Sequence, residues 1–215
     1  MGVVIGVDIG QRVDPTAIAV AEYENRAPPP TPARIIVSGK RMTEQPAVYP
    51  KDEYHFLIRH LERLPLGTPY PQVAERVAAV ARGVRERGSS TPRTYVDATG
   101  VGTPVVDLLR AAGVPQIRAV YFTHGDRRVV KEDYSISLGK AWLVSRMQAL
   151  LQGERLHLPG TPEAQALAKE LLDYEIRVDA NANDTYGAFK VGTHDDLVTA
   201  LGLAVQEVPR QLRVL

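Results

Sequence analysis

The chain has 215 residues and a formal net charge of +1, and 24% of its residues are charged. This balance is typical of a soluble globular protein with one substantial core, and it neither requires nor excludes a nucleic-acid partner. The lack of cysteine excludes disulfide bonds, zinc–thiolate sites and cysteine nucleophiles. No apolar run approaches the ~20 residues of a membrane-spanning helix, and no basic segment precedes the first apolar run as in a signal peptide. We therefore expect an intracellular protein without a membrane partner.

The first part of the chain predicts three strands followed by two helices. Residues 3–8 are an apolar run that ends in an acid, and residues 16–22 are rich in β-branched and small side chains. Residues 34–41 form a third apolar run behind a proline-rich loop, so the three segments predict an antiparallel meander. Residues 52–64 and 70–87 carry apolar side chains at helical spacing, which predicts two helices.

The rest of the chain alternates between short apolar runs and helical patterns. In chain order we expect a strand at 93–97, a helix at 103–113, a strand at 117–122, helices at 131–152 and 162–174, a hairpin formed by 175–179 and 186–191, and a last helix at 194–207. A strand–helix–strand unit after a meander predicts an α/β fold whose mixed sheet has helices on its faces. We see no internal repeat and no linker, and therefore expect a single domain over residues 1–215.

Four aspartates lie at positions in this pattern that suit a metal site. Asp8 and Asp97 each end a predicted strand, and Asp195 and Asp196 open the last helix. Two Mg²⁺ ions ~3.5–4 Å apart, held by carboxylates, activate water and stabilise the leaving oxygen of a phosphodiester. Structural roles are the alternative, since Asp195 and Asp196 suit a helix N-terminus and Asp97 suits a turn. Asp8 is harder to explain in that way, because a carboxylate that ends an apolar strand needs a partner.

Longer motifs surround these acids. They are Gly6-Val-Asp-Ile-Gly10 with Asp14-Pro-Thr-Ala17, Tyr95-Val-Asp-Ala-Thr-Gly-Val-Gly102, and Asp184-Thr-Tyr-Gly-Ala188 with His194-Asp-Asp-Leu197. In this order the motifs resemble the nuclease domain of the large terminase subunit of tailed bacteriophages. The resemblance implies a ribonuclease H-like fold, and the hairpin predicted from the sequence pattern would be an extra element before the last helix. It also implies an endonuclease that cuts double-stranded DNA during genome packaging with two Mg²⁺ or Mn²⁺ ions.

The resemblance also assigns roles to individual residues. Asp8 would bridge both metal ions, Asp97 would be the second acid, and Asp195 or Asp196 would be the acid on the last helix. We favour Asp195, because it directly follows His194 and related nucleases carry a His-Asp pair there. His194 would orient the site or contact the scissile phosphate, although a residue that merely begins a helix is the alternative.

DNA contacts are expected from cations directed at phosphates, without sequence reading. The candidates are Arg127, Arg128 and Lys131 before the long helix and Lys190 on the hairpin, which we expect to guide or cover DNA. The sequence contains no G-x-x-x-x-G-K-[ST] phosphate loop, so we expect an excised domain or a stand-alone relative. If it is excised, an ATPase motor domain, the small terminase subunit and the portal are its partners. The expected location is the cytoplasm of the bacterial host.

Three other functions fit parts of the pattern. A Holliday-junction resolvase shares the strand-end acid and the late helix acid, so only the substrate would differ. An ATPase of the actin and sugar-kinase type also begins with a strand that runs into Asp-x-Gly. The helical pattern at 103–113 and the short chain oppose that alternative. A non-catalytic DNA-binding domain of the same fold is the third, and the intact acids oppose it.

Overall fold

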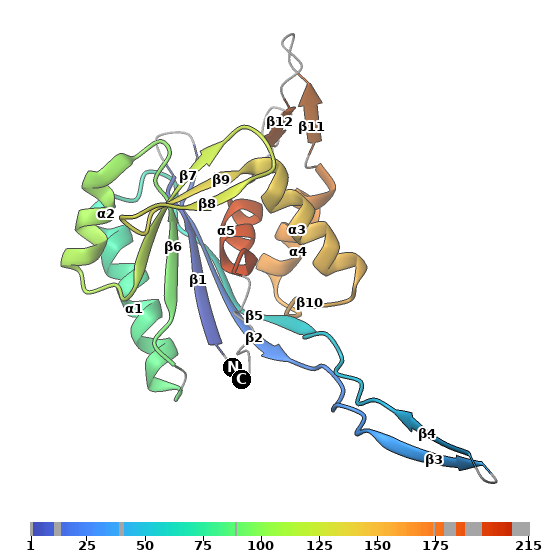
Figure 1. Cartoon of the computed structure of the whole chain (residues 1–215). Coiled ribbons are helices and arrows are strands. Elements are labelled where there is room, and N and C mark those ends of the chain that lie inside the picture. The colour runs from blue at the N-terminus through green and yellow to red at the C-terminus, as the bar shows by residue number, and fades with distance from the viewer. Residues whose placement is uncertain are drawn as a thin grey trace.

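The computed structural model describes residues 2–10, 14–38, 41–88, 90–173, 175–178, 184–187 and 195–207. An eight-stranded sheet forms its centre, with strand order β10-β5-β2-β1-β6-β7-β9-β8 (Figure 1). An antiparallel meander of β1 (Gly2–Asp8), β2 (Ala17–Asn25) and β5 (Tyr54–Arg63) makes up one half of it.

The other half of the sheet is mainly parallel. β6 (Arg93–Asp97), β7 (Ile117–Thr123) and β9 (Ile136–Gly139) follow β1 in the same direction. The edges are short: β8 (Arg128–Val130) pairs antiparallel with β9, and β10 (Leu156–His157) pairs parallel with β5. Because β1, β6, β7 and β9 are parallel, their carboxyl ends meet at one edge of the sheet.

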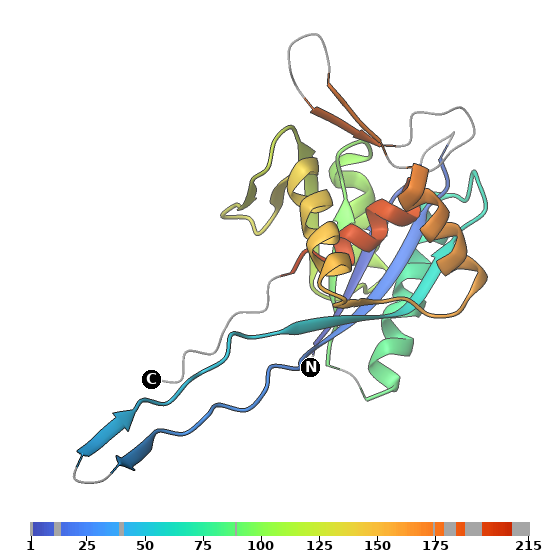
Figure 2. The same cartoon turned by 90° about the vertical axis from the view of Figure 1, so that its right-hand side faces the viewer.

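Helices cover both faces of the sheet (Figures 1 and 2). One face packs against α1 (Tyr70–Glu86) and α2 (Gly102–Ala111). The opposite face packs against α3 (Lys140–Gln152), α4 (Pro162–Asp173) and α5 (Asp196–Val205). None of the described helices is both long and apolar enough to span a bilayer.

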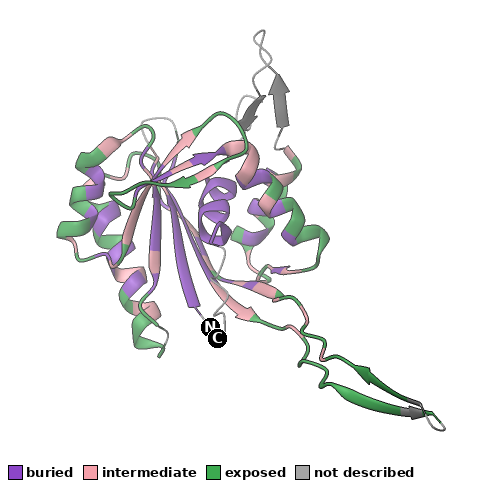
Figure 3. Ribbon diagram, viewed as in Figure 1, coloured by how far each residue is buried: buried purple, intermediate pink, exposed green. Residues whose placement is uncertain are grey.

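The helix α5 lies deep in the protein, and all of its residues are buried (Figure 3). It packs directly on β1 at Gly6, where an added Cβ would lie 2.1 Å from the Ala200 carbonyl oxygen. On its other side, a Cβ at Gly202 would lie 2.4 Å from a methyl carbon of Leu143 in α3. The two glycines therefore allow α5 to fit tightly between the sheet and α3, and this fixes the position at which α5 begins.

The predicted α/β mixed sheet with an antiparallel meander is confirmed, but its third strand was misplaced. Residues 52–64, predicted as a helix, contain β5. The error has a physical cause: His60 pairs with Val20 and Ile58 pairs with Ala21, so Arg59 is an extra residue that forms a β-bulge. The bulge interrupts the alternation of buried side chains, which hides the two-residue period of a strand.

The predicted long helix at 131–152 is also wrong in its first part. Residues 128–139 form β8 and β9, and α3 begins only at Lys140. Tyr134 has a φ of 62° in the turn between the two strands. Ile136 and Leu138 are buried on either side of the half-buried Ser137, which is the alternation of a strand.

Two small hairpins lie outside the central sheet. Residues 34–41, predicted as the third strand of the meander, instead contribute β3 (Arg34–Ser38), which pairs with β4 (Arg41–Gln45) and with no other strand that the structure describes. A hairpin before the last helix is present, as predicted, and is formed by β11 (Glu175–Val178) paired with β12 (Asp184–Gly187). Its second strand begins two residues before the predicted strand at 186–191, of which residues 188–191 lie outside the described part of the chain.

Candidate active site

The carboxyl ends of β1 and β6 and the start of α5 surround a hollow of about 330 Å³. Asp8 ends β1, Asp97 ends β6, and Asp195 and Asp196 lie at the start of α5. All four side chains line the hollow, so the structure brings the four predicted acids together. Asp14, from the segment after β1, lines it as well.

Asp8 is half-buried at the end of an otherwise buried strand. The loop behind it is held by a hydrogen bond from the Gly10 N–H to Thr16 Oγ1, 3.0 Å long. Burial raises the pKa of Asp8 well above its ordinary value, and the nearby carboxylates of Asp97, Asp195 and Asp196 raise it further. A carboxylate in this position therefore favours a proton or a cation over bare negative charge.

Asp97 is fixed by the turn that follows β6. Its Oδ1 accepts a hydrogen bond from the Thr99 N–H at 2.8 Å, and Thr99 Oγ1 accepts one from the Phe122 N–H at 2.8 Å. Burial raises the pKa of Asp97, while the hydrogen bonds from Thr99 and the charge of Lys140 lower it. Asp97 is thus both a turn residue and a member of the acidic cluster.

The structure distinguishes the two late aspartates. Asp196 is 2% exposed, and its carboxylate is bound by Arg63 through Nε at 2.6 Å and Nη2 at 3.3 Å. Asp195 is half-buried, and its carbonyl oxygen accepts the Thr199 N–H at 2.8 Å at the first turn of α5. The carboxylate of Asp196 is therefore already engaged by a cation of the protein.

A buried glutamate completes this contact on the side of α4. Arg63 also pairs with Glu170, whose other oxygen accepts the Val198 N–H at 3.3 Å. Burial and the charge of Asp196 raise the pKa of Glu170 to about 7, although Arg63 and the Val198 N–H oppose the rise. Sequence reasoning missed Arg63, because residues 52–64 were expected to form a helix and instead contain β5. It missed Glu170 because only the fold brings this residue of α4 beside Asp196.

Lys140 is the second functional candidate that sequence reasoning missed. It is the first residue of α3, it lines the acidic hollow, and its Nζ lies 5.6 Å from the centre of the Phe122 ring. Its charge lowers the pKa of both Asp8 and Asp97. The usable signal was the Gly139–Lys140 step at the carboxyl end of an apolar run, which the predicted long helix obscured.

The predicted DNA-binding residues lie elsewhere or outside the described residues. Arg127, Arg128 and Lys131 lie on or beside β8, and none of them is among the described side chains that line the hollow. Arg128 Nε donates to Gln206 Oε1 at 3.0 Å, and Lys131 Nζ lies 5.7 Å from the centre of the Tyr121 ring. The predicted residues Lys190 and His194 fall outside the described part of the chain.

The acidic cluster has the chemistry of a site for a hard divalent cation, since carboxylate oxygens are the preferred ligands of Mg²⁺. Four negative side chains around one hollow also require compensating positive charge. Within the described residues, however, no three His, Asp or Glu side chains converge closely enough to hold one ion together. The site therefore supplies the ligand type and the charge, without a preformed coordination shell among these residues.

In this mixed sheet, acids end the adjacent strands β1 and β6, and further acids lie at the start of the helix α5 that packs on the sheet. This arrangement defines a ribonuclease H-like domain. The sequence matches the family described as "Terminase RNaseH-like domain" over residues 47–207. The chain belongs to this family, which confirms the family predicted from the motifs. No curated protein sequence matches the chain significantly.

Solved structures that share this fold include terminase nucleases of two phages and of human cytomegalovirus. The large terminase nuclease of the thermophilic phage G20c with bound magnesium is 18% identical, with a TM-score of 0.58, over 96% of this chain and 81% of that chain. The nuclease domain of the large terminase of bacteriophage SPP1 with bound Mn is 12% identical, with a TM-score of 0.52, over 96% and 86%. The Mn-soaked human cytomegalovirus terminase nuclease domain is 12% identical, with a TM-score of 0.51, over 94% and 81%.

Proposed function

We propose that the chain is a single metal-dependent endonuclease domain that cuts double-stranded DNA during the packaging of a phage genome. The observation that carries the proposal is the gathering of Asp8, Asp97, Asp195 and Asp196 around one hollow in a terminase ribonuclease H-like fold. The magnesium and manganese bound to the nucleases of G20c and SPP1 support Mg²⁺ or Mn²⁺ as the cofactor.

Asp8, Asp97 and Asp195 are the residues that we assign to metal binding. When bound, two such ions would activate a water molecule and stabilise the leaving oxygen of a phosphodiester. Asp97 is held in place by Thr99, and this fixes one ligand before any ion arrives. Burial raises the pKa of Asp8, so protons compete with a cation for this carboxylate and metal binding weakens as the pH falls.

Asp196 and Lys140 have different roles in this proposal. The carboxylate of Asp196 is bound by Arg63, so Asp196 anchors the start of α5 and holds Asp195 beside the hollow. Lys140 faces the acids from α3, where its ammonium group can bind a non-bridging oxygen of the scissile phosphate. Arg127 and Lys131 are exposed beside β8 and remain candidates for contacts to more distant phosphates.

The wider setting follows from the same proposal. Duplex DNA is the substrate, and an ATPase motor domain, a small terminase subunit and a portal are the protein partners in packaging. The place of action is the cytoplasm of the infected bacterium.

Plasmid digestion with Mg²⁺, Mn²⁺ or a chelator tests the activity. Wild-type protein should nick or linearise the plasmid only with metal, and Asp8→Asn should abolish cleavage without unfolding the protein. Asp107→Asn is a matched control, because this aspartate lies on the solvent side of α2 with its side chain 61% exposed. Cleavage that persists in Asp8→Asn would remove Asp8 from the site.

A second pair of variants tests the separation of the two late aspartates. Asp195→Asn should lose activity and keep its melting temperature, because the change alters a ligand. Asp196→Asn should lower the melting temperature as well, because it weakens a buried contact with Arg63. If Asp195→Asn keeps full activity while Asp196→Asn loses only activity, the two assignments must be exchanged.

A further inference from the structure

The segment between β2 and β5 leaves the sheet and extends far from the body of the protein (Figures 1 and 2). We call residues 27–51 the arm, of which residues 39–40 are not described. Among the described strands, β3 and β4 pair only with each other, and none of the arm's described side chains is buried. An isolated two-stranded ribbon is marginally stable by itself, so an extended arm of this kind is explained by a partner.

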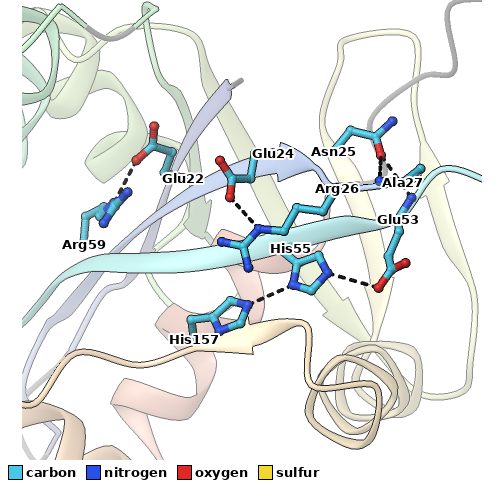
Figure 4. Close-up of polar contacts among 9 residues, drawn as sticks. All are labelled: Glu22, Glu24, Asn25, Arg26, Ala27, Glu53, His55, Arg59 and His157. Atoms are coloured by element: carbon cyan, nitrogen blue, oxygen red, sulfur yellow. Dashed lines mark hydrogen bonds and ion pairs between the residues drawn. The ribbon is translucent and has the colours of Figure 1, made fainter. Parts of the chain in front are cut away.

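The base of the arm is fastened to the sheet (Figure 4). The Arg26 N–H donates to the Glu53 carbonyl oxygen at 2.8 Å, and the Glu53 N–H donates to Asn25 Oδ1 at 3.2 Å. His55 lies 3.1 Å from a carboxylate oxygen of Glu53, and its other ring nitrogen lies 2.9 Å from His157 Nε2 in β10. These contacts tie the outgoing and returning segments of the arm to each other and to β10.

Prolines stiffen the stem of the arm, which consists of residues 27–33 and 46–51. The outgoing segment of the stem contains Pro28, Pro29, Pro30 and Pro32, and the returning segment contains Pro46 and Pro50. Proline fixes φ and has no N–H, so the stem forms only one bridge, between Thr31 and Val48. The same residues make the stem a poor edge for the addition of a strand from another protein.

The two faces of the distal ribbon differ. The register places Arg34 opposite Gln45 and Ile36 opposite Thr43, so these four share one face. Ile35 lies opposite Glu44 on the other face, where Ile35 is 66% exposed. The face with Arg34, Thr43 and Gln45 therefore offers polar side chains that can bind phosphate oxygens. The side chains of Ile35 and Ile36 are exposed as well, and can contact a partner.

Charge indicates the chemistry of that partner. By sequence the arm holds Arg34, Lys40, Arg41 and Lys51 against Glu44 alone, a net charge of +3. The whole chain has a net charge of +1, so the remainder is negative, at −2. Two arms of equal charge repel each other, which disfavours pairing of the arms of two copies. A polyanion neutralises the positive charge of the arm. Duplex DNA is such a polyanion, and its ~12 Å major groove admits a two-stranded ribbon.

We propose that the arm binds duplex DNA, mainly through its phosphates, at a place remote from the cleavage site. The inference rests on the proposed function only in taking DNA as the substrate. Asp8 lies at the carboxyl end of β1, whereas the arm leaves the sheet beside the opposite end of that strand, where Gly2 pairs with Tyr23. The six residue steps from Gly2 to Asp8 separate the two ends by ~20 Å, and the arm extends further. DNA held by the arm is thus held outside the catalytic hollow.

The experiment measures the affinity for a 40-base-pair duplex, ~136 Å long at 3.4 Å per pair, by fluorescence anisotropy without divalent metal. The arm is removed, together with the adjoining Asp52, by replacing residues 27–52 with Asn-Gly, a two-residue turn that joins the hydrogen-bonded Arg26 and Glu53. Removal should weaken binding about ten-fold at low salt and reduce the slope of log K against log salt by about 2 to 4. Arg34→Gln with Lys51→Gln should give part of this loss, and Arg82→Gln with Arg85→Gln on α1 is the charge-matched control.

Other outcomes would overturn the proposal. Unchanged affinity and salt slope would show that the arm does not bind DNA. Unchanged affinity with a lower mass in sedimentation would assign the arm to contacts with a second copy. Plasmid cleavage, measured in parallel, separates this inference from the proposed function. A protein that cleaves but shows no effect of the arm refutes the inference alone, and one that binds through the arm but never cleaves refutes the nuclease alone.

Discussion

Gly6→Ala is expected to disable the site without touching any acid. A Cβ at this position would lie 2.1 Å from the Ala200 carbonyl oxygen and 2.5 Å from the Ala204 nitrogen, both of them backbone atoms of α5. To restore the 3.4 Å of ordinary contact, α5 must retreat from β1 by more than an ångström. Because α5 begins beside Asp195, its retreat withdraws a carboxylate from the hollow.

The expected magnitudes follow from this displacement. Overpacking of a core costs about 1–3 kcal/mol, and a misplacement of ~1 Å at an active site costs about 100-fold in rate. Urea denaturation and plasmid nicking of the same preparation measure both. Gly83→Ala is the control, since nothing lies within 4 Å of a Cβ there and alanine favours the helix by about 1 kcal/mol. A Gly6→Ala protein with wild-type stability and activity would refute the packing of α5 on β1.

Two further predictions concern pH and metal. Burial raises the pKa of Glu170 from 4.5 to about 7, so the folded protein favours the protonated side chain. The stability that this preference contributes is fully present below pH 4.5 and is lost as the pH rises through 7. In urea denaturation, the free energy of unfolding of Glu170→Gln should therefore exceed that of wild type by up to about 3 kcal/mol at pH 8 and equal it near pH 4. The control is Glu163→Gln, a change at an exposed glutamate of the same helix. Equal stability of Glu170→Gln and wild type at both pH values would contradict the assigned pKa. Mn²⁺ at ten times its dissociation constant should stabilise the protein by about 1.4 kcal/mol at pH 8 and less at pH 5.5, because protons compete at Asp8. A gain in melting temperature that survives Asp8→Asn would place the ion elsewhere.

Much of the fold could be predicted because most of the helices and the parallel strands β1, β6 and β7 carry unbroken patterns. The helix α1 and the strand β6 agree with prediction to within a residue, since their apolar spacing has no competing interpretation. The errors fall where the local pattern is ambiguous. The bulge at Arg59 disguised a strand as a helix, and the short β8–β9 turn at Tyr134 was absorbed into the helix that follows.

The candidate site divides in the same way. Asp8 and Asp97 could be found because an acid at the end of an apolar strand stands out in any sequence. Arg63, Lys140 and Glu170 could not, because each is an ordinary charged residue whose importance comes only from its neighbours in space. The separate roles of Asp195 and Asp196 likewise depend on which of the two meets Arg63.

The β-bulge at Arg59 has a consequence for the site. Phe56 and Ile58 pack with α3, α4 and α5, and alternation without a bulge would next place His60 and Glu62 on that side. The extra residue reverses the alternation, so that Leu61 packs there instead and Arg63 reaches Asp196. A strand that ran through Arg59 without a bulge would turn the guanidinium of Arg63 toward α1 and bring the carboxylate of Glu62 toward Asp196. Deleting Arg59, in contrast, would leave Ala17 opposite Arg63 and keep Arg63 on its present side of the sheet. The bulge at Arg59, four positions before Arg63, thus decides whether the buried aspartate meets a positive or a negative charge.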